Sequence, residues 1–249
     1  MKFKTFGNQE LPTFLLLHAG GLSWWSWKPV IEALKEQFYI VTPIIDGHGE
    51  DGDTHFMSIE ASARTLIEYI EGNLGGRVYG IAGLSLGAQI VLEVLAQRAF
   101  IAEYAVIESA LVVPIKGIIP LAKVTCHLLY PLIRQKWFSK IQGKALYVPK
   151  EFFHLYYQDS LNISKETLIN VSISNGSYWI KDSLKHTTTQ ALVLVGEKEL
   201  RMMRKSASLI QATLSNSQLT VLKQMGHGAL SLKHHGEYVQ RLKDFFVSE

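Results

Sequence analysis

The sequence has very little cysteine: Cys126 is the only one in 249 residues, so the chain can form no internal disulfide. No apolar run is long enough to cross a bilayer, because charged residues, glycine and proline interrupt even the most apolar region, 105–122. The first six residues lack the apolar core of a secretory signal. These features predict a cytoplasmic protein that has no membrane partner.

The patterns that bind metals and nucleic acids are also missing. The chain has no His-Glu-x-x-His motif and no paired cysteines, and its 9 histidines lack ligand spacing, so we expect no metal and no cofactor. The 25 basic and 22 acidic residues are spread out, apart from a short basic cluster at 201–205, which argues against nucleic acid. We expect a small-molecule substrate as the partner, and a monomer or a homodimer.

What the chain does have is an alternation of apolar strands and helices. Buried strands are predicted at residues 11–18, 38–45, 78–82, 104–109, 191–195 and 219–222. Residues 3–6 are expected to form a hairpin with 11–18 through a turn at Gly7-Asn8, and Ser58 is expected to cap a helix that extends to Leu74. The alternation predicts an α/β fold with a mostly parallel, doubly wound sheet and helices on both faces.

The strand pattern stops between residues 110 and 180, where apolar, aromatic and helical segments replace it. This change predicts a helical lid at 110–180, inserted into a core made of residues 1–109 and 181–249. We expect the insertion to follow the sixth strand and to cover the strand ends, where ligands bind in doubly wound sheets.

The stretch from Val78 to Gly87 combines a strand, a turn of the pattern Gly-x-Ser-x-Gly and a helix. This context is typical of a nucleophile elbow, in which a strained turn lifts the hydroxyl of Ser85 above the sheet. A dinucleotide-binding loop is the competing interpretation, since Gly80, Gly83 and Gly87 also resemble a glycine-rich fingerprint. The elbow is favoured because two strand-helix units precede this stretch, whereas a dinucleotide fingerprint usually lies in the first.

A serine hydroxyl needs a base to take its proton, and the base needs an acid to hold its tautomer. Among the histidines, only His227 lies on a glycine-flanked loop after the last strand, where it can reach back to the elbow. His48 precedes Ser85 in a turn-rich loop, Asp46-Gly47-His48-Gly49-Glu50, so we expect it to brace that loop.

Taken together, these motifs resemble the α/β-hydrolase superfamily over nearly the whole chain. The matching pieces are the loop His18-Ala19-Gly20-Gly21, the loop at 46–49, the elbow at 83–87, the loop Gly196-Glu197-Lys198-Glu199 and the loop Gly226-His227-Gly228. Two positions depart from the family's usual pattern: Ala19 stands where it has glycine, and Glu199 where it has aspartate.

The resemblance implies a role for each matched residue. Ser85 is then the nucleophile, His227 the general base and acid, and the backbone N–H groups of Gly20 and Leu86 the oxyanion hole. Glu199 holds the position of the acid, while Glu197 and Asp182 remain alternatives.

With its apolar lid, such a site is expected to hydrolyse a small to medium, largely apolar carboxylic ester through an acyl-enzyme. Carbon–carbon bond hydrolysis, lactone opening and acyl transfer use the same residues in this superfamily. A weakly active or inactive ligand-binding protein on the same fold is a further alternative.

Overall fold

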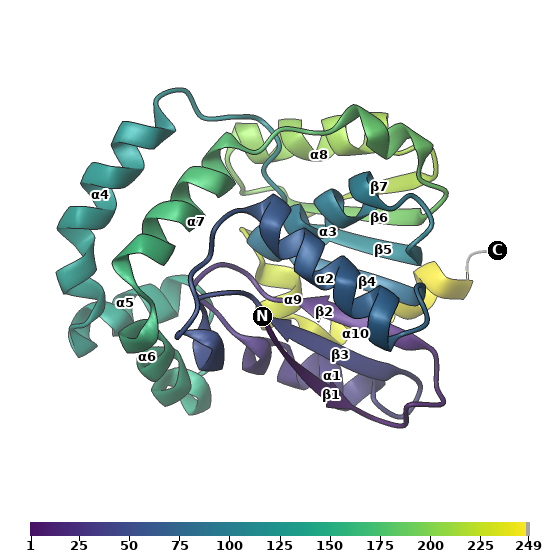
Figure 1. The fold of residues 1–249 in the computed structure, drawn as a ribbon, viewed down its shortest axis with the longest axis horizontal. Coiled ribbons are helices and arrows are strands. Elements are labelled where there is room, and N and C mark those ends of the chain that lie inside the picture. Colours follow the sequence, from purple (N-terminus) through teal and green to yellow (C-terminus); the bar gives the residue numbers. More distant parts are fainter. Residues whose placement is uncertain (248–249) are drawn as a thin grey trace.

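The computed structural model describes residues 1–247, and its centre is a seven-stranded sheet (Figure 1). The strand order is β1-β3-β2-β4-β5-β6-β7, with β1 antiparallel to β3 and every other pair parallel. The strands are β1 Lys2–Phe6, β2 Thr13–Leu17, β3 Tyr39–Ile44, β4 Val78–Leu84, β5 Ala102–Glu108, β6 Gln190–Gly196 and β7 Ser217–Leu222. The doubly wound, mostly parallel sheet expected from the sequence is therefore confirmed.

Helices cover both faces of the sheet, as the alternation of elements predicts. On one face lie α2 (Ile59–Asn73), α3 (Leu86–Gln97) and α8 (Arg201–Thr213), and on the other lie α1 (Lys28–Leu34), α9 (Ala229–Lys233) and α10 (His235–Val247). Along β2, Leu15 and Leu17 join the first core, whereas Phe14 and Leu16 join the second. Alternate side chains of a strand point to opposite faces, so one buried strand supplies both cores.

The N-terminal hairpin predicted from the sequence is wrong. β1 pairs with β3, with Phe6 opposite Ile40, while β2 lies between β3 and β4. Residues 14–17 of β2 are fully buried, which suits a central strand, whereas β1 is partly exposed along its length and occupies an edge.

The helix at the predicted Ser58 cap is confirmed. Ser58 precedes α2, and its hydroxyl oxygen accepts a hydrogen bond from the N–H of Ala61 at 3.1 Å. This bond satisfies one of the N–H groups that the first turn of a helix leaves free.

Four helices between β5 and β6 stand apart from the sheet, at the left of Figure 1, and we call them the cap. They are α4 Ile118–Ile133, α5 Lys136–Ala145, α6 Phe153–Asn162 and α7 Lys165–Ser177. We expected the cap after the sixth strand, but it follows the fifth, β5. Only the strands β1 to β5 precede it in the sequence. In residues 1–247, no helix has the length and apolar character needed to span a membrane.

Candidate active site

Ser85 lies in the turn between β4 and α3 with φ 54° and ψ −111°, a conformation that L-residues rarely adopt. The two glycines around it are required by close backbone contacts. A Cβ at Gly83 would lie 2.4 Å from the carbonyl carbon of Gly87, and a Cβ at Gly87 would lie 2.5 Å from the carbonyl oxygen of Leu17. The strand therefore turns sharply into the helix, as in a nucleophile elbow.

Gly20 and Leu86, the residues expected to form an oxyanion hole, lie next to each other. A Cβ at Gly20 would be 3.6 Å from the Leu86 side chain, so the loop after β2 packs on the start of α3. Leu86 is the first residue of that helix, and its N–H group therefore has no acceptor within the helix. Such N–H groups at a helix start favour negative charge.

His18 braces the loop that carries Gly20. Its Nε2 accepts a hydrogen bond from the N–H of Ile45 at 3.0 Å, so Nδ1 carries the hydrogen and donates to the carbonyl oxygen of Ala19 at 2.9 Å. Burial lowers the pKa of His18 to about 3, with a smaller contribution from His48. His18 therefore stays neutral and structural.

His227 and Glu199 form a direct pair, with 2.8 Å between Nδ1 of the imidazole and Oε2 of the carboxylate. The other carboxylate oxygen, Oε1, accepts hydrogen bonds from the Ser109 hydroxyl at 2.8 Å and from the Gly196 N–H at 2.7 Å. Burial raises the pKa of Glu199, but these three hydrogen bonds and the charge of His227 outweigh it, so the pKa lies below its usual value. The carboxylate is thus ionised and fixed in direction.

The two alternative acids lie elsewhere. Glu197 accepts a hydrogen bond from the Gln224 N–H at 2.9 Å, and the Asp182 side chain is 97% exposed and pairs with Lys185. Within the described part of the chain, Glu199 is the carboxylate that contacts His227.

The histidine loop packs against the elbow. Gly228 has φ +66°, and a Cβ there would lie 3.2 Å from the side chain of Leu84, the residue before Ser85. Ser85, Glu199 and His227 follow β4, β6 and β7, which are parallel, so all three lie at the carboxyl edge of the sheet. Ligands bind at this edge in open α/β sheets.

Glu108, a carboxylic acid buried at the end of β5, is not among the residues predicted from the sequence. Its Oε1 accepts a hydrogen bond from the Ser231 N–H at 3.4 Å, while Oε2 has no hydrogen-bond partner among the described residues. Burial raises its pKa from 4.5 to about 7, although Ser231 and the charge of His227 oppose the shift. The available signal was a charged residue directly after the apolar run Ala105-Val106-Ile107.

The raised pKa of the buried Glu108 carboxyl group should make the stability of the protein depend on pH. Because its pKa is higher in the folded state, its stabilising effect is complete below pH 4.5 and is lost as the pH rises through 7. Between about pH 5 and about pH 8, we expect the free energy of unfolding of the wild type to fall by about 2–3 kcal/mol relative to Glu108→Gln. Urea unfolding of both proteins at the two pH values measures this, and parallel pH profiles would contradict it.

A cavity of about 470 Å³ lies between the cap and the elbow. Gly20 and Ser85 line it from the core, and the cap contributes a largely apolar wall that includes Ile118, Ile133, Leu146, Ile163, Leu168 and Val171. Apolar walls with a few polar groups are typical of small-molecule sites.

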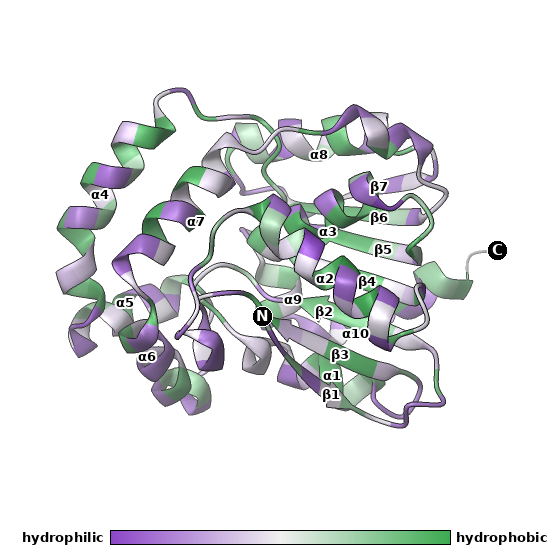
Figure 2. Ribbon diagram, in the orientation of Figure 1, coloured by the Kyte–Doolittle hydropathy of each residue, from purple (hydrophilic) through white to green (hydrophobic). Residues whose placement is uncertain are grey.

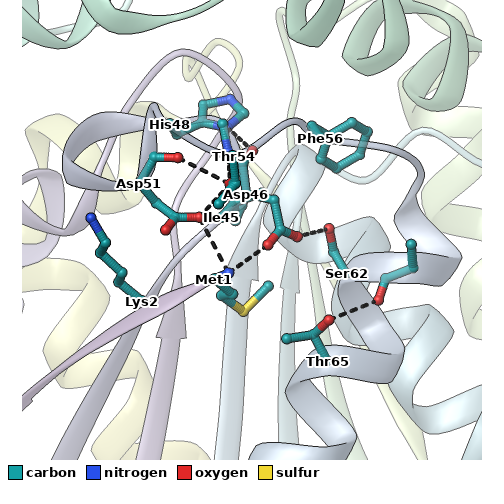
Figure 3. A network of polar contacts seen from close by, with 12 residues as sticks. Met1, Lys2, Ile45, Asp46, His48, Asp51, Thr54, Phe56, Ser62 and Thr65 are labelled. Carbon is teal, nitrogen blue, oxygen red and sulfur yellow. Dashed lines mark hydrogen bonds and ion pairs between the residues drawn. The ribbon is translucent and has the colours of Figure 1, made fainter.

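The polar groups of this cavity include His48 and Asp159. The Nδ1 of His48 lies 3.0 Å from the carbonyl oxygen of Asp46, so His48 braces its loop as expected. Figure 3 shows that loop held from below, where Asp46 meets Ser62 and the amino group of Met1.

The Nε2 of His48 is buried without a partner among the described residues, and is therefore an acceptor when Nδ1 donates. Asp159 accepts a hydrogen bond from the Trp25 indole at 2.7 Å, and burial raises its pKa to about 6. This part of the cavity is thus suited to accept a hydrogen bond from a bound molecule.

Comparison with known proteins identifies the family to which the chain belongs. The model of the alpha/beta hydrolase family matches residues 14–241, and no match was found among curated proteins. In the part of the chain that the structure describes, no group of three or more His, Cys, Asp or Glu side chains is arranged to hold a metal ion.

Several solved structures have the same fold. An esterase from Thermogutta terrifontis is 17% identical, with a TM-score of 0.75 over 98% of this chain and 92% of that one. An enol-lactonase from Burkholderia xenovorans is 14% identical, with a TM-score of 0.79 over 99% of this chain and 96% of that one. A bromoperoxidase from Bacillus anthracis is 17% identical, with a TM-score of 0.80 over 98% and 94%. The TM-scores show a shared fold, and the match to the family model, over residues 14–241, shows the family: the chain belongs to the alpha/beta hydrolase family.

Proposed function

We propose that the protein is a serine hydrolase that cleaves carboxylic esters through an acyl-enzyme. The observation that carries this proposal is the buried Glu199 carboxylate bound to His227, beside an elbow that presents Ser85 to an apolar cavity. A serine, a histidine and an oriented carboxylate at one sheet edge are the parts that nucleophilic acyl transfer requires.

The hydrogen bond between His227 and Glu199 supports the first step of the proposed catalytic cycle. Glu199 accepts the Nδ1 hydrogen of His227, which leaves Nε2 with a free lone pair to take the proton of the Ser85 hydroxyl. The serine oxygen attacks the ester carbonyl, and the N–H groups of Gly20 and Leu86 stabilise the oxyanion. His227 then gives its proton to the leaving alcohol, and the same histidine activates water to release the acid.

The cavity defines the proposed substrate class. Aliphatic side chains are the most numerous kind in its walls, beside polar ones such as Gln142 and Asn175, and its volume is about 470 Å³, so a largely apolar acyl group of small to medium size suits it. Each methylene that enters an apolar site contributes about 0.8 kcal/mol, which corresponds to at most about a fourfold gain in kcat/KM.

A series of p-nitrophenyl esters with rising acyl chain length tests this proposal. We expect kcat/KM to rise with chain length and then to fall once the chain exceeds the cavity. Leu168→Trp, which adds bulk inside the cavity, should shorten the preferred chain, whereas Leu209→Trp on the surface of α8 should leave the profile unchanged.

Two results would count against the proposal. A folded protein that hydrolyses none of the esters would contradict ester hydrolysis itself. Hydrolysis that is indifferent to chain length and to Leu168→Trp would place the acyl group outside this cavity.

A further inference from the structure

The cap carries an outward face that its own fold does not explain. On α5, Trp137 and Ile141 are 59% and 60% exposed, although large apolar side chains usually lie inside. They are four residues apart, and Lys136, Lys140 and Lys144 follow the same spacing beside them. Residues three or four apart lie on one side of a helix, so α5 presents tryptophan, isoleucine and lysines together to solvent.

The neighbouring helix α4 adds to this face. Leu121, Val124 and Leu128 are each more than half exposed and lie on one side of the helix, whereas Ala122 and Ile133 are buried on the other. The inner side packs on α7, and α4 forms the outer edge of the molecule in Figure 1. Figure 2 shows hydrophobic and hydrophilic residues alternating along this outer helix. We call the exposed side chains of α4 and α5 the outer cap face.

Electric charge is also concentrated in the cap. Residues 110–180 hold eight lysines and arginines and three acidic residues, a formal charge of +5, although the whole chain carries only +3. Among the described residues, none of Lys123, Lys136, Lys140 and Lys144 has an acidic partner. The basic side chains therefore surround the apolar ones without neutralisation.

We propose that the outer cap face docks on the surface of a bilayer that contains anionic lipids. Helices that lie in a membrane interface combine tryptophan and aliphatic side chains with lysines, which contact anionic headgroups. This proposal replaces the expectation, drawn from the sequence, that the protein has no membrane partner.

A second copy of the chain is a poorer match for this face. A two-fold interface places the same patch of both subunits together, so the unneutralised lysines of one copy would meet those of the other. Like charges placed against each other oppose association. An anionic surface instead complements the lysines and accommodates the apolar side chains between them.

Docking would also bring the cavity to the membrane, since Ile118 and Ile133 of α4 line it. If the proposed function holds, the substrate would be an amphiphilic ester drawn from the bilayer. Docking itself does not depend on that chemistry, so it is tested without an activity measurement.

The test is sedimentation of the purified full chain with two kinds of vesicle, one of phosphatidylcholine and one of equal parts phosphatidylcholine and phosphatidylglycerol. We expect binding to the anionic vesicles and much weaker binding to the neutral ones. Replacing Lys136, Lys140 and Lys144 together by glutamine should weaken binding to anionic vesicles by about 100-fold, since each lysine near the surface contributes about a fivefold gain.

A pair of apolar variants completes the test. Trp137→Ser combined with Ile141→Ser should reduce binding strongly. Phe100→Ser, which removes a similarly exposed aromatic residue (67%) from the loop before β5, should leave it unchanged. Circular dichroism checks that each variant is folded.

Absence of binding to either vesicle, or equal binding by all the variants, would overturn the proposal. Sedimentation velocity without lipid measures the oligomeric state of the wild type and of the variants. A dimer that forms in the wild type and is lost in the Trp137 and Ile141 variant would assign the face to a second copy instead.

Discussion

Replacing Ser85 by alanine is expected to lower kcat for ester hydrolysis by about 10⁵–10⁶-fold, because the acyl-enzyme can no longer form. The hydrogen bond between His227 and Glu199 does not involve Ser85, so the rest of the site should persist. The effect is measured as kcat for the best p-nitrophenyl ester. Unfolding of both proteins by urea checks that the substitution leaves stability unchanged.

Ser208→Ala provides the matched control, since Ser208 is exposed on α8 and donates only to the carbonyl oxygen of Arg204. Its activity should equal that of the wild type. Residual activity in Ser85→Ala above about one hundredth of the wild-type value would point to a different nucleophile.

The second large effect is expected for Glu199→Gln, through the tautomer of His227. In the wild type, Ser109 and the Gly196 N–H both donate to Oε1 of Glu199, so an amide oxygen would take that position. The amide NH₂ group would then face Nδ1 of His227 and donate to it. This forces the hydrogen onto Nε2, which can no longer accept the proton of Ser85, and kcat should fall by about 10⁴-fold.

Glu197→Gln is the control, because Glu197 lies two residues away on the same loop and contacts the Gln224 N–H. It should leave kcat unchanged. Double substitution of Ser109 by alanine and Glu199 by glutamine removes one of the donors that fix the amide, and should recover part of the lost rate. A Glu199→Gln enzyme with nearly wild-type kcat would refute the assignment of the acid.

The sequence predicted the parallel sheet well because its strands are buried on both sides and therefore form continuous apolar runs. It failed at the N-terminal hairpin, where the turn at Gly7 is real in its backbone angle, φ +86°, but the strands on either side of it find other partners. A local turn signal does not specify which strand pairs with which. That choice depends on the burial of β2, which only the whole sheet determines.

The candidate site shows a similar division. The glycines of the elbow and the loop around His227 are local patterns, and these residues were named from the sequence. Motif position favoured Glu199 but left Glu197 open, because Ser109, which donates a hydrogen bond to Glu199, follows a different strand, β5, that is distant in the sequence. The burial of Glu108 and the exposure of Trp137 were not predicted either. Both depend on the packing of the whole fold, which local sequence patterns do not specify.

The most direct test of the central claim is to treat the native protein with a fluorophosphonate and to locate the adduct by mass spectrometry. The proposed chemistry predicts one covalent adduct per chain, on the peptide that contains Ser85, and none after Ser85→Ala or after unfolding in urea. A folded protein that acquires no adduct, or one modified at another serine, would contradict the claim that Ser85, His227 and Glu199 form a nucleophilic site.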